Sequence, residues 1–190
     1  MPPKTKVTRN DIVEAGLYLV RQGGEKSLNA RDIAARLGCS TQPIFTNFDT
    51  MDSLREAVLE KAGELFNSCL DEERAREDGS SYKAMGLGYI RFAAEEKELF
   101  KLMYMRDRSQ DKNNADDTES VKKSVELIMK STGLGMEKAF MLHLEMWIFV
   151  HGIASMVATS YLNWEKGLVS KMLTDAYEGI KARFVTDGAG

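Results

Sequence analysis

Two histidines and a tryptophan stand at a spacing that suits the binding of a small molecule. His143, Trp147 and His151 recur every four residues, so they lie on one face of a helix. A metal site is disfavoured, because the two histidines would be about 12 Å apart along the helix axis and no cysteine or acidic cluster is close by in the sequence. Two interpretations stay open: these side chains line a ligand pocket, or they pack in the core or in a dimer interface.

The chain lacks the residue patterns of common enzymes. It has no Ser, His and Asp in a triad order, no glycine-rich phosphate loop and no metal-binding signature. We therefore expect neither enzyme activity nor a cofactor or bound metal. The two cysteines, Cys39 and Cys69, show no CxxC spacing and are too few for a disulfide framework. They fit small buried hydrophobic side chains, and a redox-sensing thiol is the alternative.

The distribution of charge separates the start of the chain from the rest. The net charge of the 190 residues is −3, but residues 1–48 carry seven basic and four acidic side chains, which leaves −6 for residues 49–190. A basic head on an acidic body suits a DNA-binding protein whose body stays away from phosphates. The chain has no run of about 18 apolar residues, so we expect no membrane-spanning helix. The basic start lacks the apolar core of a secretory signal, so we expect a cytoplasmic protein without a membrane partner.

The spacing of apolar residues predicts an all-α fold. Prolines occur only at positions 2, 3 and 43, and apolar residues recur at helical period along most of the chain. A long fourth helix is predicted from Met51 to about Leu70. Residues 71–81 and 106–118 are predicted to connect helices. The remaining predicted helices span residues 82–94, 99–103, 121–130, 137–161 and 166–184.

Capping residues mark three shorter helices before the long one. Residues 8–11 (Thr-Arg-Asn-Asp) predict a capping box at the start of the first helix, which ends at the glycine pair 23–24. Residues 29–32 repeat this logic for the second helix. Ser40 is predicted to cap a third helix over residues 41–47, where Pro43 is tolerated because it falls in the first turn.

Two short helices joined by a tight glycine turn predict a helix-turn-helix. The helices cover residues 31–37 and 41–47, and Gly38 allows the chain to reverse between them. The second helix of such a unit lies in the major groove of DNA. Gln42 has the amide geometry to read adenine, and Thr46 offers a hydroxyl to phosphate or a methyl to thymine. The predicted DNA contacts are Arg31, Thr41, Gln42, Pro43, Phe45, Thr46 and Asn47, with a basic N-terminal arm that contains Lys4 and Lys6.

These residues resemble the DNA-binding head of the TetR family. That family shows an IA…GVS…(L/I)Y…HF…K…L arrangement, and the resemblance covers about residues 8–65. Phe45 stands where the family usually has tyrosine, so the phosphate hydrogen bond of that hydroxyl is missing. Asp49 and Met51 stand where glycine and lysine are frequent, which weakens the expectation of a second phosphate contact. The matching residues here are Ile33-Ala34, Gly38-Cys39-Ser40, Ile44-Phe45, Asn47-Phe48, Met51 and Leu54.

The rest of the chain is similar to one TetR C-terminal subgroup. The similarity lies in residues 89–93 (Tyr-Ile-Arg-Phe-Ala), 99–103 and 147–152 (Trp-Ile-Phe-Val-His-Gly). It implies a helical body that binds a ligand and forms a homodimer through its last two helices. The predicted pocket residues are Tyr89, Phe92, Met103, Trp147 and His151. The predicted dimer residues are Gly152, Ser155, Met156, Met172, Ala176 and Ile180, with Ala154 and Ala158 on the same small-residue face.

The sequence thus predicts two functional parts. Residues 1–50 form a helix-turn-helix domain, and residues 51–190 form a helical ligand-binding and dimerisation domain, which the long fourth helix joins to the first. The resemblance implies a bacterial repressor that leaves a palindromic DNA operator when a small apolar or amphipathic effector binds. Three alternatives stay open: a response to a protein partner, a response to thiol oxidation, and activation of transcription instead of repression.

Overall fold

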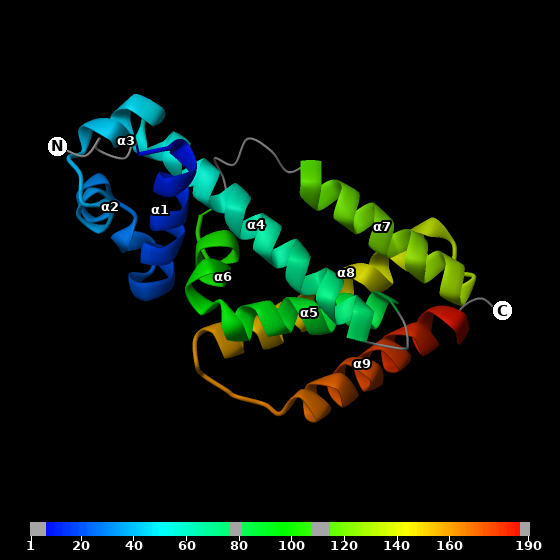
Figure 1. The fold of residues 1–190 in the computed structure, drawn as a ribbon. Coiled ribbons are helices and arrows are strands. Elements are labelled where there is room, and N and C mark those ends of the chain that lie inside the picture. Colours follow the sequence, from blue (N-terminus) through cyan, green and yellow to red (C-terminus); the bar gives the residue numbers. More distant parts are fainter. Residues whose placement is uncertain (1–6, 77–80, 108–114, 187–190) are drawn as a thin grey trace. The chain divides into compact units, whose positions relative to one another are not determined.

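The computed structural model describes residues 7–76, 81–107 and 115–186. Every regular element within these ranges is a helix, which confirms the predicted all-α class (Figure 1). The helices are α1 (Arg9–Gly23), η1 (Glu25–Ser27, a 3₁₀ turn), α2 (Ala30–Leu37), α3 (Gln42–Asn47), α4 (Met51–Arg76), α5 (Ser81–Glu95), α6 (Lys97–Tyr104), α7 (Ala115–Thr132), α8 (Met136–Ala158) and α9 (Lys166–Thr186).

The chain divides into two compact units. The head unit comprises Met1–Asn67 together with Glu96–Arg106, and the body unit comprises Ser68–Glu95 together with Asp107–Gly190. The boundary therefore falls inside α4, after Asn67. The division into a DNA-binding part and a sensing part after residue 50 concerns function, and it stays a prediction.

Local capping explains where the first helices of the head unit begin. The Asp11 amide donates to Thr8 Oγ1 at 3.2 Å and the Thr8 amide donates to Asp11 Oδ2 at 2.8 Å, which confirms the predicted capping box. The Asp32 amide donates to Asn29 Oδ1 at 3.0 Å, which confirms the second cap. Each bond satisfies an amide that has no partner within its own helix.

The predicted cap of the third helix is wrong. Helix α3 begins at Gln42, and the residue before it, Thr41, has a helical backbone (φ −72°, ψ −14°) and makes no side-chain capping bond. The amides of Ile44 and Phe45 donate to the Thr41 carbonyl at 3.1 and 3.4 Å, so the helix starts from this carbonyl. A side chain caps well only from an extended backbone, and Pro43 removes one of the amides that a cap would serve.

The head unit also contains the short helix α6, which lies far from α1 to α3 in the sequence. Leu99, Phe100 and Leu102 on α6 are buried, and α6 packs against α1. The Arg21 guanidinium donates to both carboxylate oxygens of Glu96, at 2.8 and 2.5 Å. This bidentate pair fixes the start of α6 against α1.

The body unit is built around α8, which packs against α5, α7 and α9. Tyr82 on α5 pairs with His143 on α8, and Tyr89 pairs with His151. Residue numbers rise together in the two pairs, so α5 and α8 run in the same direction. Helix α7 begins at Ala115 instead of residue 121, and α8 ends at Ala158 instead of residue 161.

Helix α8 is unusual in its composition and exposure. Among the described residues it is long and apolar enough to cross a membrane by length and composition, and 33% of its most apolar window is buried. Length and composition do not distinguish a membrane span from a helix whose apolar face is covered by another protein surface. Most of the apolar window of α8 is therefore exposed in the single chain.

Candidate nucleic-acid interface and sensor body

The turn between α2 and α3 has the conformation that its glycine predicts. Gly38 adopts the left-handed conformation (φ 64°, ψ 33°), which residues with a Cβ adopt at a cost. The Gly38 amide donates to the Ala35 carbonyl at 3.2 Å, and the Cys39 amide donates to the Ala34 carbonyl at 3.0 Å. These bonds close the end of α2 and direct the chain into α3. The helix-turn-helix is therefore held by local hydrogen bonds.

Helix α3 has one buried face and one exposed face. Ile44 is 1% exposed and Phe48, which follows the helix, is 4% exposed, so both anchor α3 in the head unit. Gln42, Phe45 and Thr46 point outward, and Phe45 is 51% exposed. The exposed face of the six-residue helix α3 thus carries an aromatic ring beside polar side chains.

Internal hydrogen bonds already engage two of the polar side chains on α3. Thr46 Oγ1 donates to the Gln42 carbonyl at 2.9 Å, and Asn47 Nδ2 donates to the Pro43 carbonyl at 2.7 Å. The Gln42 side chain, by contrast, makes no hydrogen bond within the described part of the chain. Its amide keeps both donor and acceptor for an outside partner.

The arginines of α1 and α2 differ in whether their guanidinium groups stack on an aromatic ring. Arg31, in the first turn of α2, is exposed. Arg36 lies with its guanidinium carbon 3.3 Å from the centroid of the Tyr18 ring, and Arg9 lies 4.6 Å from that of Phe48. Sequence reasoning missed the stacking of Arg36, because no local pattern pairs the end of α2 with α1. The predicted arm residues Lys4 and Lys6 lie outside the described residues.

The body unit holds two tyrosine–histidine pairs between α5 and α8. Tyr82 Oη lies 3.0 Å from His143 Nδ1, and Tyr89 Oη lies 2.9 Å from His151 Nδ1. Burial lowers the pKa of both histidines below its usual value and raises the pKa of the Tyr82 hydroxyl. Burial thus favours the neutral form of both imidazoles, and the two pairs form a polar ladder between α5 and α8.

The predicted pocket residues are brought together only in part. Trp147 stacks on the His151 ring with centroids 5.4 Å apart, and Tyr89 bonds to the same histidine. Phe92 is 1% exposed on α5, one turn from Tyr89, whereas Met103 belongs to α6 in the head unit. A hollow of about 600 Å³ lies beside the turn between α7 and α8, and none of the five residues lines it.

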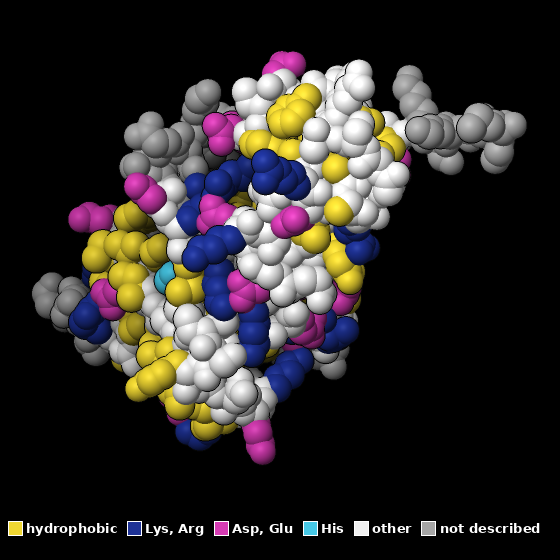
Figure 2. All heavy atoms as spheres, turned by 90° about the vertical axis from the view of Figure 1, so that its left-hand side faces the viewer, with side chains coloured by type: hydrophobic (Ala, Val, Ile, Leu, Met, Phe, Trp, Pro, Cys, Tyr) yellow, Lys and Arg dark blue, Asp and Glu magenta, His cyan; other side chains and the backbone are white. Residues whose placement is uncertain are grey.

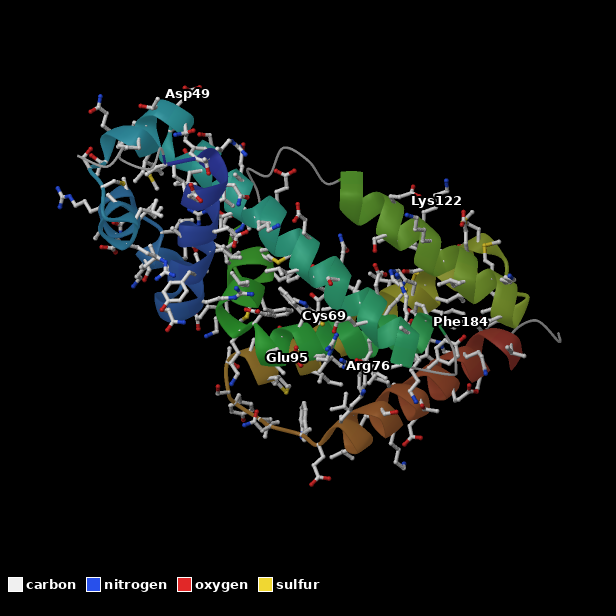
Figure 3. The ribbon with its side chains drawn as sticks, viewed as in Figure 1. Asp49, Cys69, Arg76, Glu95, Lys122 and Phe184 are labelled. Carbon is white, nitrogen blue, oxygen red and sulfur yellow. The ribbon has the colours of Figure 1, made fainter. Side chains whose placement is uncertain are left out.

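A buried carboxylate that sequence reasoning missed joins three helices of the body unit. Glu73 on α4 is fully buried, with Arg91 Nε on α5 3.3 Å from one oxygen and Lys166 Nζ on α9 2.5 Å from the other. Arg91 also donates to the Cys69 carbonyl at 2.8 Å. Figure 3 labels Cys69 and Arg76 on either side of this position along α4. Nothing in the charged run around residue 73 singles out this glutamate, because its burial depends on α5 and α9.

The predicted dimer residues fall on α8 and α9, which pack side by side. Met156 is 39% exposed, and the other five are half-buried. The two alanines expected on the same face, Ala154 and Ala158, are 0% and 1% exposed, so that expectation is wrong: they pack inward. Larger apolar side chains form the exposed surface instead. They are Met136, Phe140, Met141, Trp147, Ile148 and Met156 on α8, and Leu168 and Val185 on α9.

Figure 2 shows hydrophobic side chains next to a histidine, and both histidines of the chain lie on α8. This apolar surface and the exposed face of α3 are the two faces of the chain on which the predicted dimer and DNA contacts fall.

Comparison with known proteins decides the family. Residues 82–176, half of the chain, match the family described as "Tetracyclin repressor-like, C-terminal domain". The chain belongs to the TetR family. It is therefore a DNA-binding transcriptional regulator with a helical ligand-binding domain, as the sequence predicted.

Individual relatives agree with this assignment. An uncharacterized HTH-type transcriptional regulator of Mycobacterium tuberculosis, Rv0681, is 25% identical over 162 residues, which are 83% of this chain and 73% of the relative. A TetR-like transcriptional regulator from Rhodococcus sp. RHA1 has the same fold, with a TM-score of 0.67, 15% identity and 98% of each chain covered. The multidrug binding protein EbrR, in complex with imidazole, follows with a TM-score of 0.62, 19% identity and 88% of each chain covered.

Proposed function

We propose that this TetR-family regulator is a cytoplasmic, homodimeric repressor that leaves a palindromic DNA operator when a small apolar or amphipathic effector binds its body. The exposed face of α3, set on the left-handed turn at Gly38, is the observation that carries the DNA-binding part. A recognition helix must present unengaged polar and apolar groups to base edges. Gln42 and Phe45 do so.

The exposed apolar surface of α8 and α9 supports the dimer. Ile148 is 58% exposed and Leu168 is 48% exposed, and a monomer in water would leave these side chains uncovered. A second copy related by a two-fold axis would cover them with the same surface. It would also hold two recognition helices about 34–36 Å apart, one turn of the duplex.

The sensing role rests on the polar ladder of the body unit. Tyr89, His151 and Trp147 place hydrogen-bonding groups next to aromatic rings, and apolar walls with few polar groups are typical of small-molecule sites. The structural neighbour EbrR is named a multidrug binding protein, which favours a small apolar or amphipathic molecule as the effector here.

Helix α4 offers the route from effector to operator. It is one continuous helix whose residues belong to both units. An effector that displaces α5 or α8 would shift the end of α4 that Glu73 and Arg91 hold. A coupling free energy of about 1–3 kcal/mol would lower operator affinity about 5–150-fold.

Selection from random duplex DNA tests the DNA-binding part. We expect the purified protein at low salt to enrich a palindrome with half-sites about one turn apart. The test variant combines Gln42→Ala with Phe45→Ala, two exposed positions outside the buried core of the head unit. An equal enrichment by this variant, or none by the wild type, would contradict the proposal.

The oligomeric state tests the dimer directly. Ile148→Glu places a charge on the exposed face of α8, so we expect the variant to sediment as a folded monomer. Glu60→Gln, at an exposed position of α4, serves as the control that stays dimeric. A variant Ile148→Glu that is still a dimer would place the interface elsewhere.

Thiol oxidation is a weaker alternative to a small effector. Cys69 is 8% exposed, and burial raises the pKa of its thiol, which disfavours the reactive thiolate. Operator binding by a variant with Cys39→Ser and Cys69→Ala should respond to an effector as the wild type does. An oxidant response that this variant loses would favour the redox alternative.

A further inference from the structure

Helix α3 carries no lysine or arginine. Its six residues are Gln42, Pro43, Ile44, Phe45, Thr46 and Asn47. Guanine is read in the major groove most often by an arginine or lysine that donates to its O6 and N7 atoms. If α3 is the recognition helix, as the proposed function holds, it therefore has no side chain of the kind that usually selects guanine.

Arg9, Arg31 and Arg36 of the head unit lie on α1 and α2, outside α3. Arg36 and Arg9 are stacked on the Tyr18 and Phe48 rings of the head unit. Arg31 is exposed on α2, and the first helix of a helix-turn-helix crosses the phosphate backbone. These cations suit contacts to phosphates, which carry no sequence information of their own.

The hydroxyl of Thr46 is oriented by the helix itself. Its proton is donated to the Gln42 carbonyl at 2.9 Å, so the oxygen is left only as an acceptor. Phosphate oxygens and the O4 atom of thymine are acceptors too, and they gain no hydrogen bond from it. The other group that Thr46 presents on this exposed helix is its methyl group.

Phe45 and Thr46 are both exposed on α3, and each presents an apolar group, an aromatic ring and a methyl group. The thymine C5-methyl is the apolar group that base pairs present in the major groove. At the start of the same face, Gln42 keeps a free amide. An amide donates to N7 and accepts from the N6 amino group of adenine, so Gln42 suits an adenine, and the apolar groups of Phe45 and Thr46 suit a thymine.

We propose that α3 recognises an operator half-site built on A·T pairs, with Phe45 and Thr46 against thymine methyl groups and Gln42 on an adenine edge. This inference rests on the proposed function and adds the base class of the operator. Helix α3, which has no lysine or arginine, does not read guanine.

Base analogues test the proposal on the operator recovered by selection. Deoxyuridine in place of thymidine removes only the C5-methyl group, and we expect about 4-fold weaker binding for each contacted position, the effect of one buried methyl group. 7-Deazaadenine removes the N7 acceptor, and we expect at least about 5-fold weaker binding at the position that Gln42 reads. 7-Deazaguanine at any guanine of the half-site should leave affinity unchanged.

Two near-isosteric variants separate the methyl group from the hydroxyl of Thr46. Thr46→Val keeps a methyl group and loses the hydroxyl, so we expect it to retain wild-type affinity and sensitivity to deoxyuridine. Thr46→Ser keeps the hydroxyl and loses the methyl group, so its affinity should fall and its sensitivity to deoxyuridine at the contacted position should disappear. Unfolding midpoints of both variants show whether the fold is retained.

The outcomes distinguish the failure of this inference from that of the proposed function. Enrichment of half-sites with invariant guanines whose 7-deaza analogues weaken binding would overturn the base class alone. Indifference to deoxyuridine at every thymine would do the same. The absence of any enriched sequence would overturn both.

Discussion

Gly88 lets α5 pass close to α4 in the body unit. A Cβ atom built at Gly88 would lie 2.9 Å from Leu70 Cδ2, 3.1 Å from Leu70 Cα and 3.4 Å from Glu73 Cβ. Leu70 Cδ2 is the end of a flexible side chain, but the Leu70 Cα is backbone and moves only with α4. We therefore predict that Gly88→Ala destabilises the protein.

The magnitude follows from two opposing effects. Alanine in a helix is more stable than glycine by about 1 kcal/mol. Insertion of a methyl group into a packed contact costs about 1–3 kcal/mol, and the backbone contact places this site at the upper end. The net expectation is a free energy of unfolding lowered by about 2 kcal/mol, or a melting temperature about 4–8 °C lower for a chain of this size.

Gly63 provides a matched control in another helix. A Cβ atom at Gly63, on α4, has no atom within 4 Å, so Gly63→Ala gains helix stability without a clash. Its melting temperature should rise by about 2–4 °C. The two variants make the same chemical change and should shift stability in opposite directions.

Thermal unfolding at one fixed protein concentration measures both shifts. The fixed concentration matters because a dimer is stabilised by mass action. If Gly88→Ala melts at or above the wild-type temperature, the close packing of α5 on α4 is not present in the protein, and the account of how α4 is held would be refuted with it.

Two further predictions concern charges in the body unit. Because burial lowers the pKa of His143 and His151, their neutral form favours the folded state, so stability is complete above about pH 6.5 and falls below it. Unfolding midpoints at pH 7.5 and 5.0 measure this loss, and changing both histidines to glutamine should flatten the profile; a flat wild-type profile would contradict the argument. Arg91→Met should lower the free energy of unfolding by about 3–5 kcal/mol, because it leaves the buried carboxylate of Glu73 with less compensation. Arg76→Met, at an exposed partner of the same carboxylate, should cost under about 1 kcal/mol in the same denaturant titration, and equal losses would count against the burial of the pair.

Short-range features of this protein could be predicted from its sequence. The caps at Thr8 and Asn29 and the turn at Gly38 depend on residues within four positions, so the local sequence contains all the partners of these bonds. The same holds for the family motif, which lies in one continuous segment of the head. The cap predicted at Ser40 is wrong although it too is local, because Thr41, with a helical backbone, precedes α3 and makes no side-chain capping bond.

Helix faces were harder to assign where both sides are apolar. Ala154 and Ala158 were expected outside, and Ile148 and Trp147 are the exposed side chains instead. Small and large apolar residues alternate around α8 without a polar stripe that would mark the solvent side. The choice of face depends on which neighbouring helices fit, and periodicity does not contain this information.

The sequence by itself determined the all-α class, the helix-turn-helix and the family, because helical period, caps and motif spacing are properties of neighbouring residues. Only the tertiary structure decided that Glu73 is buried between Arg91 and Lys166, that α6 belongs to the head unit, and that tyrosines of α5 pair with histidines of α8. Each of these facts joins residues between 18 and 93 positions apart or places a helix by its packing. Such contacts form only when helix faces meet, and a local pattern allows many pairings of faces with similar free energy.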